Sequence, residues 1–193
     1  MRNHKTILLT LKVFQATGGI EKVCRIIGKA LYEDAALTSK KIQVFSMYDK
    51  PNDADDNVYF PSEIFKGYGK NKIHFVLSSL WNARTADSII MSHINLLVIG
   101  WFIKILFPKK RLILIAHGIE VWSKLSFFRR KMLKTCDVIC SVSEFTKKKI
   151  IEVNRVDEIK NKVLNNCIDP FLPPGKEFKR LGNLRTSLDL SED

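Results

Sequence analysis

Two histidines are the side chains of this sequence best suited to proton transfer and to holding hydroxyl groups. His93 follows an apolar run over 89–91, and His117 follows another over 112–116. An imidazole titrates near neutral pH, so either side chain can bond a hydroxyl or move a proton. A lone histidine is usually structural, but the end of a strand is where α/β proteins bind ligands. We therefore predict that both contact a ligand, with Gly118 allowing its close approach.

A pair of glycines, Gly18 and Gly19, offers a different chemistry. They stand between an apolar strand pattern and an amphipathic helical pattern that starts at Ile20. The N–H groups at a helix N-terminus, helped by the helix dipole, bind phosphate or another anion. A tight turn that binds nothing explains the glycines equally well. We take Gly18, Gly19 and Ile20 as candidate binding residues.

The elements that must position these residues alternate regularly along the chain. Apolar strand patterns lie near 6–14, 41–47, 87–92, 111–116, 137–142 and 162–165. Helical patterns lie near 19–32, 71–82, 94–107, 122–134 and 143–153. This order predicts an α/β fold with an open, doubly wound, mostly parallel Rossmann-like sheet. Such sheets bind ligands at the carboxyl ends of their strands, where the glycines, His93 and His117 should converge.

Composition limits the partners and the compartment. The chain has 193 residues and a formal net charge of +12, which predicts one domain, two at most, and an anionic partner. Candidates are nucleic acid, an acidic lipid surface and a phosphorylated small molecule. The four cysteines lie in apolar segments without metal-ligand spacing, which favours reduced, buried thiols and a cytoplasmic location. They are Cys24, Cys136, Cys140 and Cys167.

Two apolar stretches could be mistaken for membrane segments. Lys12 interrupts the first, and no cleavage site follows it, so we expect no signal peptide. Residues 89–107 approach spanning length but contain His93, Asn95 and Lys104, so we predict a buried strand followed by a buried helix.

Residues 49–70 are rich in Asp, Asn, Pro and Gly and predict a long, mobile loop, either a lid or slack chain. Asp53 and Asp55 have the spacing of metal ligands, but an acidic loop favours a solvated turn, so we assign no metal.

Taken in order, these motifs resemble those of GT-B glycosyltransferases of family 4. The resemblance rests on Gly18-Gly19-Ile20-Glu21, on His117-Gly118, on the sequence DVICSVS over 137–143, and on Asn166-Cys167-Ile168-Asp169. It covers residues 5–193 but only the N-terminal half of that two-domain fold. It implies an acceptor-binding domain over 1–170, with 171–193 as an interdomain linker or the start of a C-terminal donor domain.

The resemblance also implies roles for single residues. Gly18 and Gly19 match a glycine loop that faces the donor phosphates and the acceptor, and His117 matches a histidine near the transferred sugar. His93 lies where many members line the acceptor pocket. Asn166 matches a step into the interdomain linker, although Asn165 replaces a common proline and Cys167 a common glycine.

Glu120, three residues after His117, has two readings. It could bind substrate beside His117 and Gly118. Alternatively, its charge could favour the N-terminus of the next helix through the dipole. We keep it among the substrate-binding candidates.

The implied activity is sugar transfer, with retention, from a nucleotide-sugar donor to a glycan or a lipid-linked acceptor. The donor is a co-substrate, and no cofactor or metal is expected. Because the family's donor-binding residues lie in the C-terminal domain, the present chain is expected to be inactive alone.

Residues 122–134 mix aromatic and cationic side chains, as helices at anionic membranes do. We predict membrane contact at Lys124, Arg129, Arg130 and Lys131, and a peripheral position on the inner face of the cell membrane. The alternative is that the apolar residues pack on the sheet while the cations are solvated.

A different class of function is a basic Rossmann-like module that binds nucleic acid or a phosphorylated ligand. The sequence has no helix-turn-helix, zinc-finger or RNA-stacking signature, so we expect no nucleic-acid partner. It also lacks G-x-G-x-x-G after the first strand and a P-loop lysine motif, which argues against dinucleotide and ATP binding.

Overall fold

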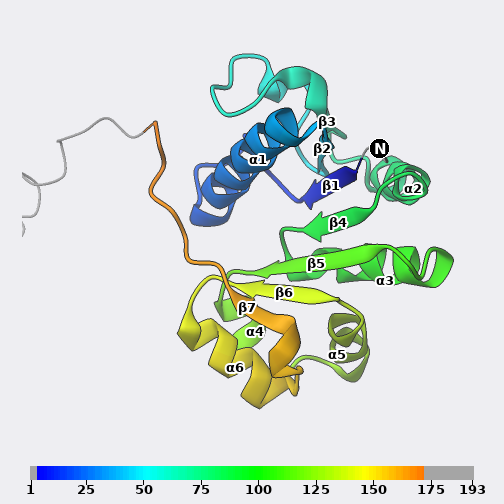
Figure 1. Ribbon diagram of the computed structural model, residues 1–193, viewed down its shortest axis with the longest axis vertical. Helices are drawn as coiled ribbons and strands as arrows, with labels where there is room; N and C mark the ends of the chain where they lie inside the picture. Colours follow the sequence, from blue (N-terminus) through cyan, green and yellow to red (C-terminus); the bar gives the residue numbers. More distant parts are fainter. Residues whose placement is uncertain (1–3, 172–193) are drawn as a thin grey trace, which may run out of the picture.

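The computed structural model describes residues 4–171 of the chain. They form a seven-stranded sheet in the order β3-β2-β1-β4-β5-β6-β7, in which every neighbouring pair is parallel (Figure 1). The strands are β1 (Lys5–Thr10), β2 (Lys41–Ser46), β3 (Phe65–Gly67), β4 (Ser88–Met91), β5 (Arg111–Ala116), β6 (Val138–Ser141) and β7 (Asn161–Val163). The order reverses between β1 and β4, which is the topological switch point of the fold.

Helices connect successive strands. They are α1 (Gly19–Thr38), α2 (Lys72–Ala83), α3 (Leu97–Leu106), α4 (Ile119–Trp122), α5 (Phe127–Lys134) and α6 (Glu144–Asn154), with short 3-10 turns η1 (Pro51–Ala54), η2 (Ser62–Ile64), η3 (Ile94–Leu96) and η4 (Glu158–Lys160). Helices cover both faces of the sheet, so the predicted doubly wound Rossmann-like architecture is confirmed.

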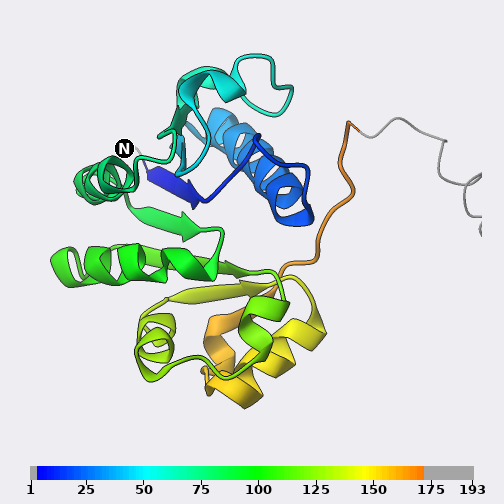
Figure 2. The ribbon, with the colours of Figure 1, turned by 180° about the vertical axis from the view of Figure 1, so that it is seen from behind.

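The two faces of the sheet are covered unequally. Helix α1 packs on one face through the small side chains of Cys24 and Ala35, which share a core with Leu8 and Val44, while Gly28 lies against the Phe60 ring. The other face carries α2, α3, α5 and α6 over a larger core (Figure 2). Strands buried on both faces must be apolar throughout, which explains their continuous hydrophobic sequences.

Two predicted elements need correction. The helix predicted over 122–134 starts only at Phe127, since Trp122 ends α4 and Ser126 caps α5 by accepting a hydrogen bond from the N–H of Arg129 at 3.4 Å. A serine hydroxyl at this position begins a new helix rather than continuing an old one. Helix α1 runs to Thr38, six residues beyond the predicted 19–32, and ends where Ser39 takes the left-handed conformation (φ 55°).

The segment 49–70 was predicted as a loop, but it contains η1, η2 and the edge strand β3. Gly67 of β3 lies against the backbone of Asp49 and Lys50, where a Cβ would clash. A three-residue strand surrounded by turn-forming residues has too little apolar periodicity to be found from sequence. The segment therefore adds a strand to the sheet instead of serving as slack chain.

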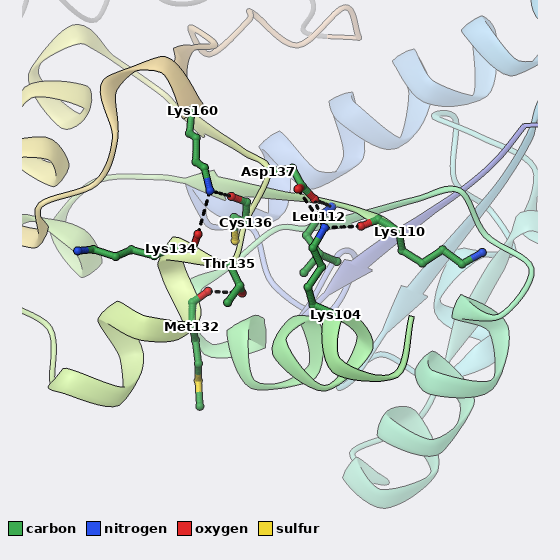
Figure 3. Close-up of polar contacts among 9 residues, drawn as sticks. All are labelled: Lys104, Lys110, Leu112, Met132, Lys134, Thr135, Cys136, Asp137 and Lys160. Atoms are coloured by element: carbon green, nitrogen blue, oxygen red, sulfur yellow. Dashed lines mark hydrogen bonds and ion pairs between the residues drawn. The ribbon is translucent and has the colours of Figure 1, made fainter. Parts of the chain in front are cut away.

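Charged side chains join the elements at the amino ends of β5 and β6 (Figure 3). Asp137 receives hydrogen bonds from the Lys104 ammonium at 2.8 and 2.9 Å and from the N–H of Leu112 at 2.7 Å. The Lys160 ammonium donates to the carbonyls of Lys134 and Cys136 at 3.0 and 3.2 Å. Asp137, the first residue of the DVICSVS motif, therefore has a structural role, because it joins α3 to β5.

The described cysteines are all free thiols. Cys24 and Cys136 are buried as predicted, and burial raises the pKa of each to about 12. Cys140 is half-buried and Cys167 is exposed, so the prediction of burial was wrong for Cys167, which follows β7 in irregular chain. Among residues 4–171, no helix combines the length and apolar character needed to cross a membrane.

Candidate functional site

A small pocket opens at the switch point, where β1 and β4 end beside the start of α1. Its volume is about 230 Å³. The lining residues come from the loops after β1, β2 and β4 and from the first turn of α1: Leu11, Lys12, Ile20, Glu21, Tyr48, Ser92 and His93. Ammonium, carboxylate, hydroxyl and imidazole groups thus face one cavity beside two aliphatic side chains. Such a mixture suits a polyhydroxylated or charged small molecule.

The loop between β1 and α1 is fixed by a buried carboxylate. Asp49, which is 0% exposed, accepts hydrogen bonds from the N–H groups of Val13 at 2.6 Å and Gln15 at 2.8 Å, and more weakly from Phe14 at 3.3 Å. The hydroxyl of Ser46 donates to the same carboxylate at 2.5 Å. Donors of the chain itself engage both carboxylate oxygens. Asp49 therefore fixes the loop that contributes Leu11 and Lys12 to the wall of the pocket.

The hydrogen bonds of Asp49 also argue against dinucleotide binding. Dinucleotide-binding Rossmann domains use an acidic residue after the second strand to hold the ribose. Asp49 follows β2, but its oxygens bond the loop after β1. This geometry agrees with the absent glycine fingerprint in arguing against a dinucleotide ligand.

His93 lies in the wall of the pocket, as predicted for a residue that ends a strand of the sheet. It caps η3, with its Nδ1 accepting a hydrogen bond from the N–H of Asn95 at 3.1 Å. In the neutral ring the proton must therefore be on Nε2, which remains a donor. Burial lowers the pKa of His93, so the neutral form is favoured.

His117 follows β5 and is tied to the loop after β4. Its Nε2 lies 2.8 Å from the carbonyl oxygen of Ser92. A carbonyl only accepts, so Nε2 carries the proton and Nδ1 keeps its lone pair in the neutral ring. Burial lowers the pKa of this imidazole too, although the Ser92 carbonyl opposes the shift. His117 does not line the pocket but contacts Ser92, which does.

The residues after His117 form a tight turn. Glu120 accepts a hydrogen bond from the N–H of His117 at 2.6 Å, which gives its carboxylate a structural partner at the start of α4. Gly118 is buried with φ 142°, a conformation that favours glycine, and a Cβ there would lie 3.1 Å from the Trp122 ring. The turn thus holds the backbone of His117.

Gly18 and Gly19 lie at the exposed start of α1, next to Ile20 in the pocket wall. A Cβ at Gly18 would clash with the Glu21 carboxylate, which folds back over the helix N-terminus. A Cβ at Gly19 would meet nothing within 4 Å. Because the atoms near position 18 belong only to the end of the flexible Glu21 side chain, packing requires glycine at neither position, and position 19 is open toward solvent.

Asn166 is placed away from this pocket. It is exposed in the segment after β7 and lines a separate apolar groove of about 380 Å³ between α1 and β4–β6. Asp169, beyond it, accepts a hydrogen bond from the Tyr59 hydroxyl at 2.7 Å, and this bond lowers the pKa of Asp169. The structure thus gathers Ile20 and His93 in the pocket, with Gly18, Gly19 and His117 beside it, but not Asn166.

Sequence reasoning missed five of the seven lining residues, namely Leu11, Lys12, Glu21, Tyr48 and Ser92. Lys12 and Tyr48 follow β1 and β2, and Ser92 follows β4, so each could have been found from its place after a strand. Glu21 was read only as part of the family motif. Their side chains carry no distinctive spacing, so their convergence depends on the strand order, which the sequence does not display.

We expect the free energy of unfolding to fall as the pH is lowered through 6.5, because the two histidines bind protons less readily when the chain is folded. Burial lowers each pKa from the ordinary value of 6.5. As pH falls through that value, the unfolded chain takes up protons first, so the stabilisation contributed by the two neutral histidines decreases. This contribution is lost fully below the folded-state pKa values. The charges of Glu21 and Glu120 partly oppose the lowering of both histidine pKa values, whereas the charge of Arg129 adds to the lowering at His93.

Urea unfolding at several pH values measures this dependence. The double variant His93→Gln/His117→Gln should have a flatter profile than the parent. His74→Gln, at an exposed histidine of α2, should keep the parent slope. Equal slopes in the parent and the double variant would disprove the assignment.

No family model and no curated protein matches the chain. The solved structure of HepE from Anabaena in complex with UDP has 15% sequence identity and a TM-score of 0.63, over 96% of this chain and 50% of HepE. The lipopolysaccharide outer core galactosyltransferase WaaB has 14% identity and a TM-score of 0.56, over 97% of this chain and 58% of WaaB. A glycosyltransferase from Rickettsia africae has 15% identity and a TM-score of 0.55, over 99% and 51%. The chain spans about half the length of these proteins, and at such identities the likeness shows a shared fold.

Proposed function

We propose that this chain forms the acceptor-side half of a GT-B glycosyltransferase of family 4, which transfers a sugar from a nucleotide-sugar donor to a hydroxyl of a glycan or lipid-linked acceptor with retention. The observation that carries the proposal is the pocket at the β1–β4 switch point, where Lys12, Glu21 and His93 surround a cavity of about 230 Å³. Solved structures that share the fold include HepE with UDP-glucose and two proteins named as glycosyltransferases, which supports this class.

The size and chemistry of the pocket fit one sugar ring. Hydroxyl groups can bond the Glu21 carboxylate, the Lys12 ammonium and the Nε2–H of His93, while Leu11 and Ile20 provide apolar contact. His117, whose Nδ1 has a free lone pair, lies beside the pocket with its Nε2 bonded to the Ser92 carbonyl, and it is proposed to contact the reacting sugar. Gly19 gives the donor phosphates access to the N-terminus of α1.

The domain boundaries follow from the same proposal. Residues 1–170 are the acceptor-binding domain, and 171–193 lead to a C-terminal domain that supplies most donor contacts. All of this second segment except Phe171 lies outside the described residues, as does the 184–193 stretch that resembles the approach to the donor domain.

Gly19→Ala tests the donor-phosphate part of the proposal. A methyl group at position 19 meets no neighbouring atom, and alanine favours helices more than glycine does. We expect unchanged or slightly higher stability but weaker binding of UDP-glucose, by about tenfold. Calorimetric titration of the chain continued past Asp193 through its reading frame measures the affinity, alongside thermal unfolding.

Ala36→Gly, at an exposed position of the same helix, is the control for helix propensity. It should change stability but not UDP-glucose affinity. Unchanged affinity in Gly19→Ala would contradict phosphate binding at this turn.

A further inference from the structure

Helices α2, α3 and α5 expose large apolar side chains on the sheet face opposite α1. Helix α3 contacts both α2 and α5, so the three form a continuous layer (Figure 2). Their exposed residues include Leu77, Trp81, Phe102, Ile105, Phe127 and Phe128, which are between 44% and 71% exposed. We name this surface the α2–α3–α5 face. Large apolar side chains exposed on neighbouring helices mark an interaction site, because burying them is favourable.

Helix α3 illustrates how unusual the face is. Lys104 is the only charged or polar side chain among its ten residues. A helix that is apolar on all sides is normally buried on all sides. Here the inner side packs on the sheet through Ile99 and Ile103, while Phe102 and Ile105 point outward and are uncovered. The earlier prediction of a buried helix is therefore correct for only one side of α3.

The charges of the face have one sign. None of α2, α3 and α5 contains Asp or Glu. Arg129, Lys131 and Lys134 are exposed on α5, and the guanidinium of Arg84 lies 4.3 Å from the centre of the Trp81 ring. Lys104 is the exception, since its ammonium bonds Asp137 within the fold (Figure 3). Exposed aromatic rings beside cations, without acids, match the chemistry of an anionic lipid surface.

We propose that the α2–α3–α5 face docks on an anionic lipid bilayer, with Trp81, Phe127 and Phe128 entering the headgroup region and Arg129 and Lys131 contacting lipid phosphates. This extends the surface predicted from Lys124 and Arg129–Lys131 to two further helices. The inference goes beyond sugar transfer and does not depend on it.

Two other occupants fit the observations less well. A second copy of the chain would bring an equally cationic, acid-free surface against this one, which costs electrostatic energy. The chain's own continuation starts elsewhere, because residues 164–171 run beside α1, where Tyr59 bonds Asp169 and packs on Phe171. That path leads along the opposite face of the sheet.

The face is joined to the pocket by one stretch of chain. His93 lies in the pocket wall, and η3 and α3 follow it directly. The charge of Arg129, in the first turn of α5, helps to lower the pKa of His93. A bilayer on this face would therefore contact α3, which is joined to the pocket residue His93 by the short turn η3 alone.

Co-sedimentation with lipid vesicles tests the docking surface. The full chain should bind vesicles of phosphatidylcholine with phosphatidylglycerol, bind pure phosphatidylcholine weakly, and release as salt rises. Arg129→Glu/Lys131→Glu should weaken partitioning to the anionic vesicles by more than about tenfold, because each cation near the surface contributes about fivefold. Leu77→Ser/Trp81→Ser should weaken it by about tenfold through lost apolar insertion.

Matched variants elsewhere serve as controls. Leu37→Ser/Ile159→Ser removes two apolar side chains that are 87% and 79% exposed, and Lys148→Glu/Lys162→Glu reverses two exposed cations. Both should keep most of the parent binding. The proposal is overturned if the control variants and the face variants lose vesicle binding equally, or if the parent chain does not bind anionic vesicles. It is also overturned if sedimentation velocity shows a dimer that Leu77→Ser/Trp81→Ser dissociates. Because vesicle binding is read without a sugar donor, its failure leaves the proposed glycosyl transfer untouched.

Discussion

Asp49→Ala is expected to lower the free energy of unfolding by about 3 kcal/mol and to release the loop between β1 and α1. The carboxylate is 0% exposed and bonds the N–H groups of Val13 and Gln15 and the hydroxyl of Ser46. Alanine would leave the buried Val13 N–H and its neighbours without an acceptor, which costs more than the hydrogen bonds themselves are worth.

Urea unfolding gives the free energy, and hydrogen exchange at the amides of Val13 and Gln15 reports the loop directly. Asp56→Ala, at an exposed residue of the same acidic segment, should change the free energy by less than about 0.5 kcal/mol. If Asp49→Ala costs as little as this control, the carboxylate does not hold the pocket loop. If the fold survives, the altered wall should also weaken ligand binding at Lys12, which lies in the same loop.

His117→Ala is expected to reduce kcat/KM for sugar transfer by about 100-fold in the chain extended past Asp193, with little loss of stability. The imidazole is half-buried, its Nε2 bonds the Ser92 carbonyl, and the lowered pKa keeps Nδ1 available as an acceptor at neutral pH. Removing it takes away the group proposed to contact the reacting sugar.

His117→Gln separates contact with the sugar from support of the loop. The glutamine amide can donate to the Ser92 carbonyl as Nε2 does, but it is not an imidazole. If glutamine is as inactive as alanine while both variants unfold at the parent temperature, the ring itself acts on the substrate. Full activity in His117→Gln would reduce the role of His117 to a tether between the β4 and β5 loops.

The sheet was predictable because burial on both faces leaves a strong pattern. The apolar runs of β1, β2, β4, β5 and β6 are each bounded by helical periodicity, and their parallel arrangement follows from that alternation. The pattern fails for β3, whose Phe65-Lys66-Gly67 is short, lies at the edge and is preceded by turn residues. It also fails to separate α4 from α5, since the break depends on the capping hydroxyl of Ser126.

The candidate site was predictable only in outline. Placing Ile20 and His93 near one another required the general rule for strand ends and no detail of packing. Asp49 was not singled out, because a buried acid bonded to backbone N–H groups has the same sequence signature as a solvated one in an acidic loop. Asn166 was placed with the site by family resemblance, whereas the chain after β7 turns toward α1.

The most direct test of the proposed function is a transfer assay with the chain continued past Asp193 through its reading frame, given radiolabelled nucleotide sugars and a panel of glycan and lipid-linked acceptors. We expect incorporation of label into an acceptor by the extended chain, none by the present 193 residues alone, and a loss of about 100-fold in His117→Ala. If the reading frame encodes no second Rossmann-like domain and no nucleotide sugar is bound or consumed, the glycosyltransferase assignment is wrong, and the switch-point pocket belongs to a binding module.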